Sequence, residues 1–184
     1  IDEVVLCEDG HAQERSLLEQ VVLLFFKNDL VIADRNFCVL SFFFGMKKRG
    51  TRFIIRQHKT MPWKSLGKAR YVGRCDGGRV YEEPIELRDP QTCKTMQIRR
   101  ITIRLTTPTR EGETEIHLLT NLPAKVPASK VANLYRQRWT LEHAFNELTT
   151  HLRCELNTLG YPKAALFAFC VAVCSYNVLA ATKG

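Results

Sequence analysis

The sequence predicts an α/β fold with a β-rich insertion placed before two long C-terminal helices. Apolar runs alternate with helical periodicity at the start of the chain, short β-type runs fill its middle, and helical spacing returns after Pro127. The predicted core therefore comprises residues 1–58 and 112–184, and the predicted insertion comprises residues 59–111.

The first elements are expected to alternate between strands and helices. In chain order they are a strand at 2–10, a helix at 10–26, a strand at 29–34, a helix at 37–49 and a strand at 51–58. Asp34 closes the second of these strands, and Gly50 is the expected stop of the second helix.

The insertion is expected to consist of short strands separated by turns such as DGG at 76–78. In RITIRLT (100–106), Ile101 and Ile103 alternate with polar residues, which predicts a half-buried strand with a polar, basic outer face. A further strand is expected within 113–123, and two helices follow, at about 130–153 and from 162 towards the C-terminus.

Positive charge is concentrated in one part of the chain, whose formal net charge is +8. Residues 47–110 contain 17 Lys and Arg against 5 Asp and Glu, a net of +12, and the other 120 residues contain 10 against 14, a net of −4. A solvated surface without a role is one interpretation. A surface that faces a polyanion such as nucleic acid explains the segregation better.

Seven cysteines form no CxxC pair with the spacing of zinc ligands, which favours a reduced, cytoplasmic protein.

The segment 164–181 has 18 residues without a charge, the length at which a membrane span is considered. Because the segment contains Ser175 and Asn177 and is rich in alanine, we expect a helix buried in the α/β core and no membrane span.

The stretch YRQRWTLEHAF (135–145) places Tyr135, Arg138 and Glu142 on one side of the predicted helix. An ion pair between Arg138 and Glu142, worth about 0.2–0.5 kcal/mol, explains two of these residues but leaves Tyr135 and Trp139 unexplained. A carboxylate at the edge of a buried face also suits a metal ligand.

A second candidate ligand is Asp34, because open α/β sheets place ligand-binding groups at the carboxyl ends of their strands. A turn or cap role is the simpler interpretation of an aspartate at such a position. Asp34 and Glu142 together, with a basic segment between them, favour a metal site that acts on a polyanion.

These residues resemble the bacterial insertion-sequence transposases of family four type, which have a ribonuclease H-like DDE core and a Tyr–x2–Arg–x3–Glu–x6–Lys signature. Tyr135, Arg138 and Glu142 match the signature spacing, and Trp139 matches its usual surroundings. LVIADRNF (30–37) resembles the strand that bears the second catalytic aspartate, which would be Asp34. LLTNLP and LGYPKAALFAF further along also resemble the family.

The resemblance implies a ribonuclease H-like catalytic domain that cleaves phosphodiesters at transposon ends and transfers the freed 3′-hydroxyl to target DNA. Asp34 and Glu142 would be catalytic residues and ligands of two Mg²⁺ or Mn²⁺ ions. Tyr135, Arg138 and Trp139 would bind DNA near the cleaved bond. The resemblance also implies a homodimer in the active complex and a place with DNA in the bacterial cytoplasm.

The basic insertion would track the DNA backbone, with Arg99, Arg100 and Arg104 as the expected contacts.

Two departures from the family pattern lead us to expect a C-terminal fragment of the catalytic domain that is inactive alone. Thr149 stands where the signature has lysine, and the strand of the first catalytic aspartate is not recognised in the chain. Asp2 and Asp9 are the remaining candidates for that ligand. The alternative is a catalytically inactive DNA-binding fragment of a decayed or domesticated transposase.

Overall fold

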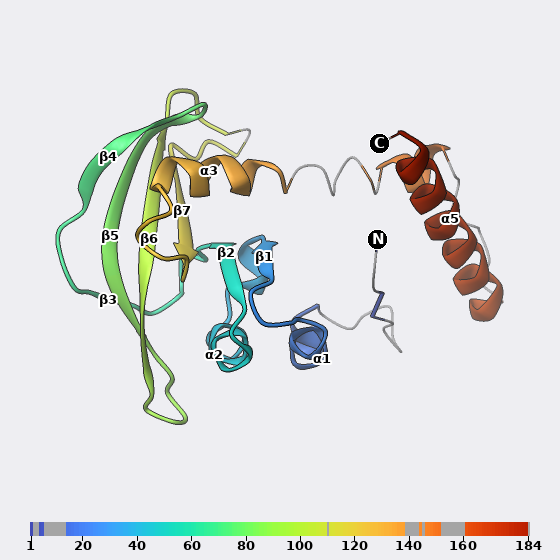
Figure 1. The fold of residues 1–184 in the computed structure, drawn as a ribbon, viewed down its shortest axis with the longest axis horizontal. Coiled ribbons are helices and arrows are strands. Elements are labelled where there is room, and N and C mark those ends of the chain that lie inside the picture. The colour runs from blue at the N-terminus through green and yellow to red at the C-terminus, as the bar shows by residue number, and fades with distance from the viewer. Residues whose placement is uncertain are drawn as a thin grey trace. The chain divides into compact units, whose positions relative to one another are not determined.

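The computed structural model describes residues 1, 4–5, 14–109, 111–138, 144, 146–151 and 161–183. The chain forms two compact units, which we call the sheet unit (Val5–Gln137) and the terminal unit (Ile1–Val4 with Arg138–Gly184). The sheet unit contains a seven-stranded sheet, and the described part of the terminal unit includes a long helix (Figure 1).

The elements of the sheet unit follow the predicted order. They are η1 (Glu14–Leu17), α1 (Leu18–Leu23), β1 (Leu30–Ala33), η2 (Arg35–Phe37), α2 (Leu40–Arg49), β2 (Arg52–Arg56), β3 (Lys64–Ser65), β4 (Arg70–Cys75), β5 (Gly78–Arg88), β6 (Thr95–Leu105), β7 (Glu115–Thr120) and α3 (Ala128–Arg136). The expected strands at 29–34 and 51–58 are confirmed as β1 and β2.

Helix α2 confirms the helix expected at 37–49, and Gly50 ends it with a left-handed φ of 74°. The helix expected over 10–26 is confirmed in part, by η1 and α1. Most of the strand expected at 2–10 lies outside the described residues.

The sheet has the strand order β1-β2-β7-β6-β5-β3, and β4 also pairs with β5. Strands β1 and β2 are parallel and are connected through α2, whereas every other pairing is antiparallel. The strands of the predicted insertion therefore continue the same sheet as β1 and β2.

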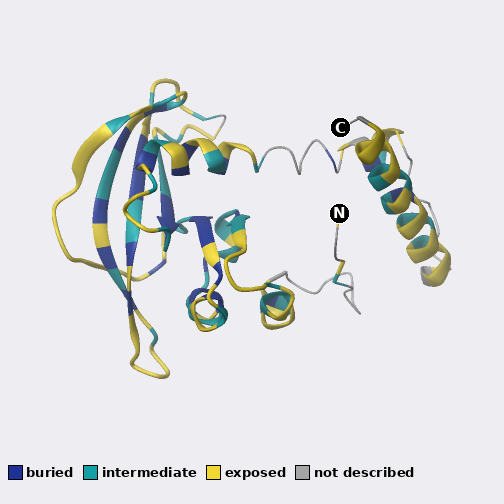
Figure 2. Cartoon of the chain, viewed as in Figure 1, coloured by how far each residue is buried: buried dark blue, intermediate teal, exposed yellow. Residues whose placement is uncertain are grey.

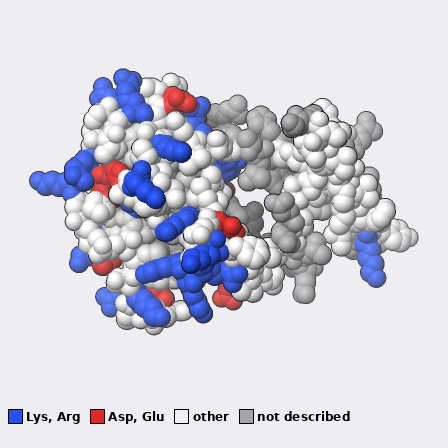
Figure 3. All heavy atoms as spheres, in the orientation of Figure 1, with Lys and Arg blue, Asp and Glu red and all other residues white. Residues whose placement is uncertain are grey.

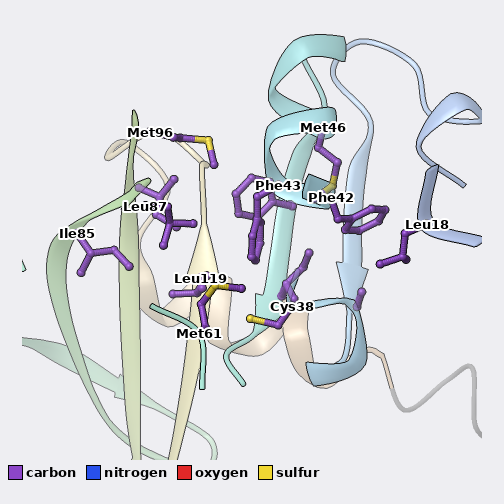
Figure 4. Close-up of a cluster of buried hydrophobic side chains, with 14 residues drawn as sticks. Leu18, Cys38, Phe42, Phe43, Met46, Met61, Ile85, Leu87, Met96 and Leu119 are labelled. Atoms are coloured by element: carbon purple, nitrogen blue, oxygen red, sulfur yellow. The ribbon is translucent and has the colours of Figure 1, made fainter. Parts of the chain in front are cut away.

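The helices cover the two faces of this sheet with separate cores. Ile55 packs into a cluster with Phe42 and Phe43 of α2, which we call the α2-side core (Figure 4). Its neighbour Ile54 packs with Val131 of α3 in a second cluster, the α3-side core. Since successive strand residues point to opposite faces, α2 and α3 lie on opposite sides of the sheet.

Strand β6 buries residues on both faces, and the buried face changes halfway along the strand. Met96 and Ile98 belong to the α2-side core, whereas Ile101 and Ile103 belong to the α3-side core. The predicted burial of Ile101 and Ile103, with Arg104 on the exposed polar side, is confirmed. The change of face was not predicted from the sequence.

The terminal unit contains η3 (Glu147–His151) and α5 (Pro162–Lys183). Ile1 is held to α5, because its backbone nitrogen lies 2.7 Å from Asn177 Oδ1 and its carbonyl accepts from Asn177 Nδ2 at 2.7 Å. The described ends of the helix expected at 130–153 are α3 and η3; residues 139–143 lie outside the described part.

Helix α5 is exposed over most of its surface (Figure 2). By length and composition alone it could cross a membrane, since its most apolar stretch has a mean hydropathy of 2.0, and 6% of that stretch is buried. We expected a helix buried in the α/β core, but the contacts of α5 within its own unit bury little of it. The sequence pattern could not reveal this, because an apolar composition shows which surface avoids water but not what covers it.

We expect Gly78→Ala to destabilise the sheet unit by about 2–3 kcal/mol. Gly78 has φ 156°, and a Cβ there would lie 1.9 Å from the carbonyl oxygen of Arg104 in the paired strand. Gly77→Ala is the matched control, because its added Cβ would meet only Leu105 Cδ2 at 3.7 Å. Urea unfolding of the two variants should differ; equal midpoints would contradict the strained geometry at Gly78.

Candidate active site and nucleic-acid interface

Asp34 lies at the carboxyl edge of the sheet, directly after β1. Strands β1 and β2 are parallel, so both end at this edge, where α/β folds place ligand-binding groups. Asp34 Oδ1 accepts a hydrogen bond of 2.8 Å from the backbone N–H of Asn36 and thereby caps η2. The cap fixes the carboxylate and uses one of its two oxygens, so both interpretations of Asp34 are compatible with the geometry.

The surroundings of Asp34 are dominated by a network of ion pairs. Arg35 lies 3.3 Å from Glu111 and 3.7 Å from Glu113, and Glu113 also pairs with Arg56 at the end of β2. The arginines neutralise the two glutamates and tie the connection between β6 and β7 to the edge near Asp34. Asp34 is therefore the one carboxylate of this group that has no ion pair within the described residues.

Tyr135 lies in the last turn of α3, and its side chain packs into the α3-side core with 5% of its surface exposed. The end of α3 is also held by Arg136, which pairs with Asp76 of the β4–β5 turn at 2.8 Å. The structure thus places Tyr135 as an anchor of α3 on the sheet. Its predicted contact with DNA stays a prediction.

The remaining residues of the predicted helix signature belong to the terminal unit. Arg138 is partly buried there, and Trp139 and Glu142 lie outside the described residues. Thr149, at the position of the signature lysine, lies in η3 and donates to the carbonyl of Asn146 at 3.3 Å. The predicted meeting of Asp34 and Glu142 therefore stays a prediction.

Arg99 and Arg100, predicted to bind DNA, are both engaged inside the sheet unit. Arg99 pairs with Glu82 at 2.6 Å on the α3 side, and Arg100 pairs with Glu83 at 2.5 Å on the α2 side. Their side chains are only 12% and 14% exposed. Two consecutive glutamates on β5 thus match two consecutive arginines on β6, where the buried face of both strands changes.

The sequence contains two charged doublets, Glu82–Glu83 and Arg99–Arg100, which could have indicated these ion pairs. The count of net charge did not reveal them. A net charge sums over a segment, but cross-strand pairs remove individual charges from the surface. Arg104 differs from the doublet: its side chain is 58% exposed, although it pairs with Glu115 at 2.9 Å.

His117 lies beside these arginines on the α2 side, where its Nδ1 lies 3.0 Å from Thr102 Oγ1. Burial lowers the pKa of His117, and the nearby charge of Arg100 lowers it further. The lowered pKa favours the neutral imidazole, so His117 adds little positive charge to this face.

A divalent ion at the carboxyl edge would need hard oxygen ligands, and Asp34 fits that need through the oxygen that does not cap η2. In the part of the chain that the structure describes, no group of three His, Cys, Asp or Glu residues could hold a metal ion. Asp34 alone is thus insufficient, and the other ligands would have to come from outside the described residues.

Comparison with known proteins supplies a family for this arrangement. A family model described as "Transposase DDE domain" matches residues 3–178, which is nearly the whole chain. The match includes β1 with Asp34, all strands of the sheet, and the segment that contains Glu142. No curated protein matches the sequence.

We expect Arg100→Met to destabilise the sheet unit by about 2–3 kcal/mol, because it leaves the carboxylate of Glu83, with 10% of its side chain exposed, without its cation. The double variant Arg100→Met/Glu83→Leu should return to within about 1 kcal/mol of the original protein, since neither charge is then buried alone. Urea unfolding measures both. A single variant as stable as the original would show that the pair is dispensable and would restore Arg100 as a candidate DNA contact.

Proposed function

The chain belongs to the transposase DDE domain family, and from this premise we propose that it forms the catalytic part of a bacterial insertion-sequence transposase. The proposed reaction is metal-dependent cleavage of phosphodiesters at transposon ends, followed by attack of the freed 3′-hydroxyl on target DNA. The observation that carries the proposal is the match over residues 3–178 together with a capped aspartate, Asp34, at the carboxyl edge of the sheet.

Asp34 and Glu142 are the proposed catalytic carboxylates, and they would hold Mg²⁺ or Mn²⁺, with two ions in the complete site. Such ions polarise a phosphodiester and activate the attacking oxygen in an in-line displacement. The contribution of Asp34 is positional: its cap on η2 sets the direction of the carboxylate before DNA binds.

The third carboxylate would come from a strand beside β1. Within the described residues β1 pairs only with β2, so the backbone of its other edge can receive a further strand. We assign residues 1–58 and 112–184 to a ribonuclease H-like core and residues 59–111 to its insertion. On this proposal the 184-residue chain alone does not cleave DNA, because two carboxylates do not hold two ions in the geometry of in-line attack.

Arg138 would bind a DNA phosphate next to the cleaved bond, because a guanidinium matches two phosphate oxygens at once. Trp139 would lie against the same DNA, and Tyr135 would fix the point at which the chain leaves the sheet unit towards Arg138. The active complex would be a homodimer on double-stranded DNA in the bacterial cytoplasm. The absence of a lysine at Thr149 keeps the catalytically inactive DNA-binding fragment as the alternative.

We expect Asp34→Asn and Glu142→Gln each to lower cleavage by about 10³-fold or more, since each removes a charge that the metal requires while preserving the shape of the side chain. DNA binding should be retained by both variants. The measurement is magnesium-dependent nicking of a labelled duplex that carries the element's own end, by a protein that joins this chain to its upstream coding sequence.

Arg138→Ala is the comparison variant, and it should weaken both binding and cleavage because a phosphate contact is lost. Full cleavage by Asp34→Asn would remove Asp34 from the site. Robust nicking by residues 1–184 alone would instead point to Asp2 or Asp9 as the third ligand.

We also expect the carboxylates of Asp34 and Glu142 to lie within roughly 10 Å of each other when the site is assembled, a separation that a pair of metal ions can bridge. A crystal structure grown with Mn²⁺ and DNA measures this separation, and the anomalous signal locates the ions independently. Carboxylates much farther apart, or Mn²⁺ bound away from Asp34, would contradict the proposed site.

A further inference from the structure

Three arginines form one row across neighbouring strands of the sheet. Arg74 of β4 is paired with Arg79 of β5, and Arg79 is paired with Arg104 of β6. The row ends at Glu115 of β7, the partner of Arg104. All three arginine side chains are exposed.

The row lies on the α2 side of the sheet, away from α3. Val80 and Ile103, which neighbour the row in β5 and β6, are buried in the α3-side core, so Arg79 and Arg104 point to the other face. Cys75 packs against the same α3-side core, which places Arg74 of β4 with the other two. The register and the burial pattern thus agree on one basic row.

The row carries an electrostatic cost that the described residues of the sheet unit offset only at Arg104. Like charges placed directly opposite on neighbouring strands destabilise a sheet. Arg104 has Glu115 as its partner, but Arg74 and Arg79 have no ion pair or hydrogen bond through their side chains in the part of the chain that the structure describes. An external polyanion would remove this repulsion, which an uncharged partner would not do.

An aromatic row flanks the arginines. Tyr71 pairs with Tyr81 across β4 and β5, with ring centroids 5.6 Å apart, and the guanidinium of Arg104 lies 4.4 Å from the centre of the Tyr81 ring. Tyr71 is 56% exposed. The stacking limits the motion of Arg104 and holds it in the row, so less side-chain entropy is lost when an anion binds.

The row and Asp34 lie at the same edge of the sheet. Strands β2, β6 and β4 run in one direction, since β7 and β5 are antiparallel to them, and Arg104 and Arg74 lie near the carboxyl ends of their strands. Figure 3 shows basic side chains spread over the sheet unit with few acidic ones among them. An extended ligand on the row would thus reach the edge that contains Asp34.

We propose that the row Arg74–Arg79–Arg104 is the surface of the insertion that binds the DNA phosphate backbone, in place of the predicted Arg99 and Arg100. This inference rests on the proposed function, which makes DNA the substrate. Three arginines on strands about 4.8 Å apart span about 10 Å, so the row can face two or three successive phosphates of one DNA strand. The contacts carry affinity and orientation but no sequence preference.

The test compares two pairs of substitutions with equal loss of charge. Arg74→Gln/Arg79→Gln removes two charges from the row, and Arg70→Gln/Arg88→Gln removes two exposed charges whose registers place them on the α3 side. Neither of the control arginines has a side-chain partner in the described residues. The probe is a fluorescein-labelled 30-base-pair duplex of arbitrary sequence, titrated without metal over a range of salt concentrations.

The slope of log K against log salt is negative, and we expect its magnitude to decrease by about 1.8 for the row variant, about 0.9 for each lost phosphate contact. The slope of the control variant should change little. Arg74→Lys/Arg79→Lys should keep the slope, since it keeps both charges. The melting temperature of the glutamine row variant should equal or exceed that of the original protein, because repulsion is removed; this separates lost contacts from lost folding.

Equal slope losses in the row and control variants would show a general charge effect and overturn the proposal, as would an unchanged slope in the row variant. A row variant that melts earlier would show that the arginines support the fold, and the single Arg79→Gln change then decides on the same slope criterion. If the slopes differ as expected but Asp34→Asn still cleaves DNA, the catalytic proposal fails while the DNA surface stands. If instead the slopes do not differ but Asp34→Asn abolishes cleavage, the proposed DNA surface fails and the catalytic proposal stands.

Discussion

Strands β5 and β6 bury side chains on both faces of the sheet, and the rest of the sheet unit depends on how they change from one face to the other. The part of the strand pair that contains Ile85 and Ile98 covers the α2-side core. The part that contains Val80 and Ile103 covers the α3-side core. Where the buried face changes, polar side chains on both faces of the sheet become partly enclosed by the protein. Two cross-strand Arg–Glu pairs occupy these positions, and each buried charge keeps its partner.

The same constraint decides which arginines can meet a ligand. Arg99 and Arg100, where the buried face changes, form ion pairs with glutamates and are largely buried. Beyond this change, the α2 face of β4, β5 and β6 is no longer needed to cover a core, so exposed arginines can stand opposite each other there. The apolar pattern along a strand pair therefore distinguishes arginines that form buried ion pairs from arginines that are exposed. The net charge of the segment does not make this distinction.

Much of the sheet unit could be predicted from local patterns. The apolar runs ending at Asp34 and before Gln57 became parallel strands, and Gly50 ended α2, because each depends on a few neighbouring residues. The partners of Arg99 and Arg100 were missed because they lie 17 residues away, and register decides them. The low burial of α5 within its own unit was missed because burial depends on packing partners. Of the candidate catalytic pair, the structure describes Asp34, whose place at the carboxyl edge follows from strand direction; Glu142 lies outside the described residues.

The two features at the carboxyl edge have complementary electrostatic roles. Near Asp34 the arginines are already satisfied by Glu111 and Glu113, so they add little field that would repel a cation from the aspartate. Farther along the same edge, Arg74 and Arg79 have no such partners in the described part of the chain, which favours the proposed contact with an anion. At the proposed metal site the pairing of the nearby arginines matters, because unpaired cations beside Asp34 would compete with the metal for its carboxylate. Within the described residues, the sheet pairs its arginines beside Asp34 and leaves Arg74 and Arg79 without ion pairs several strands away.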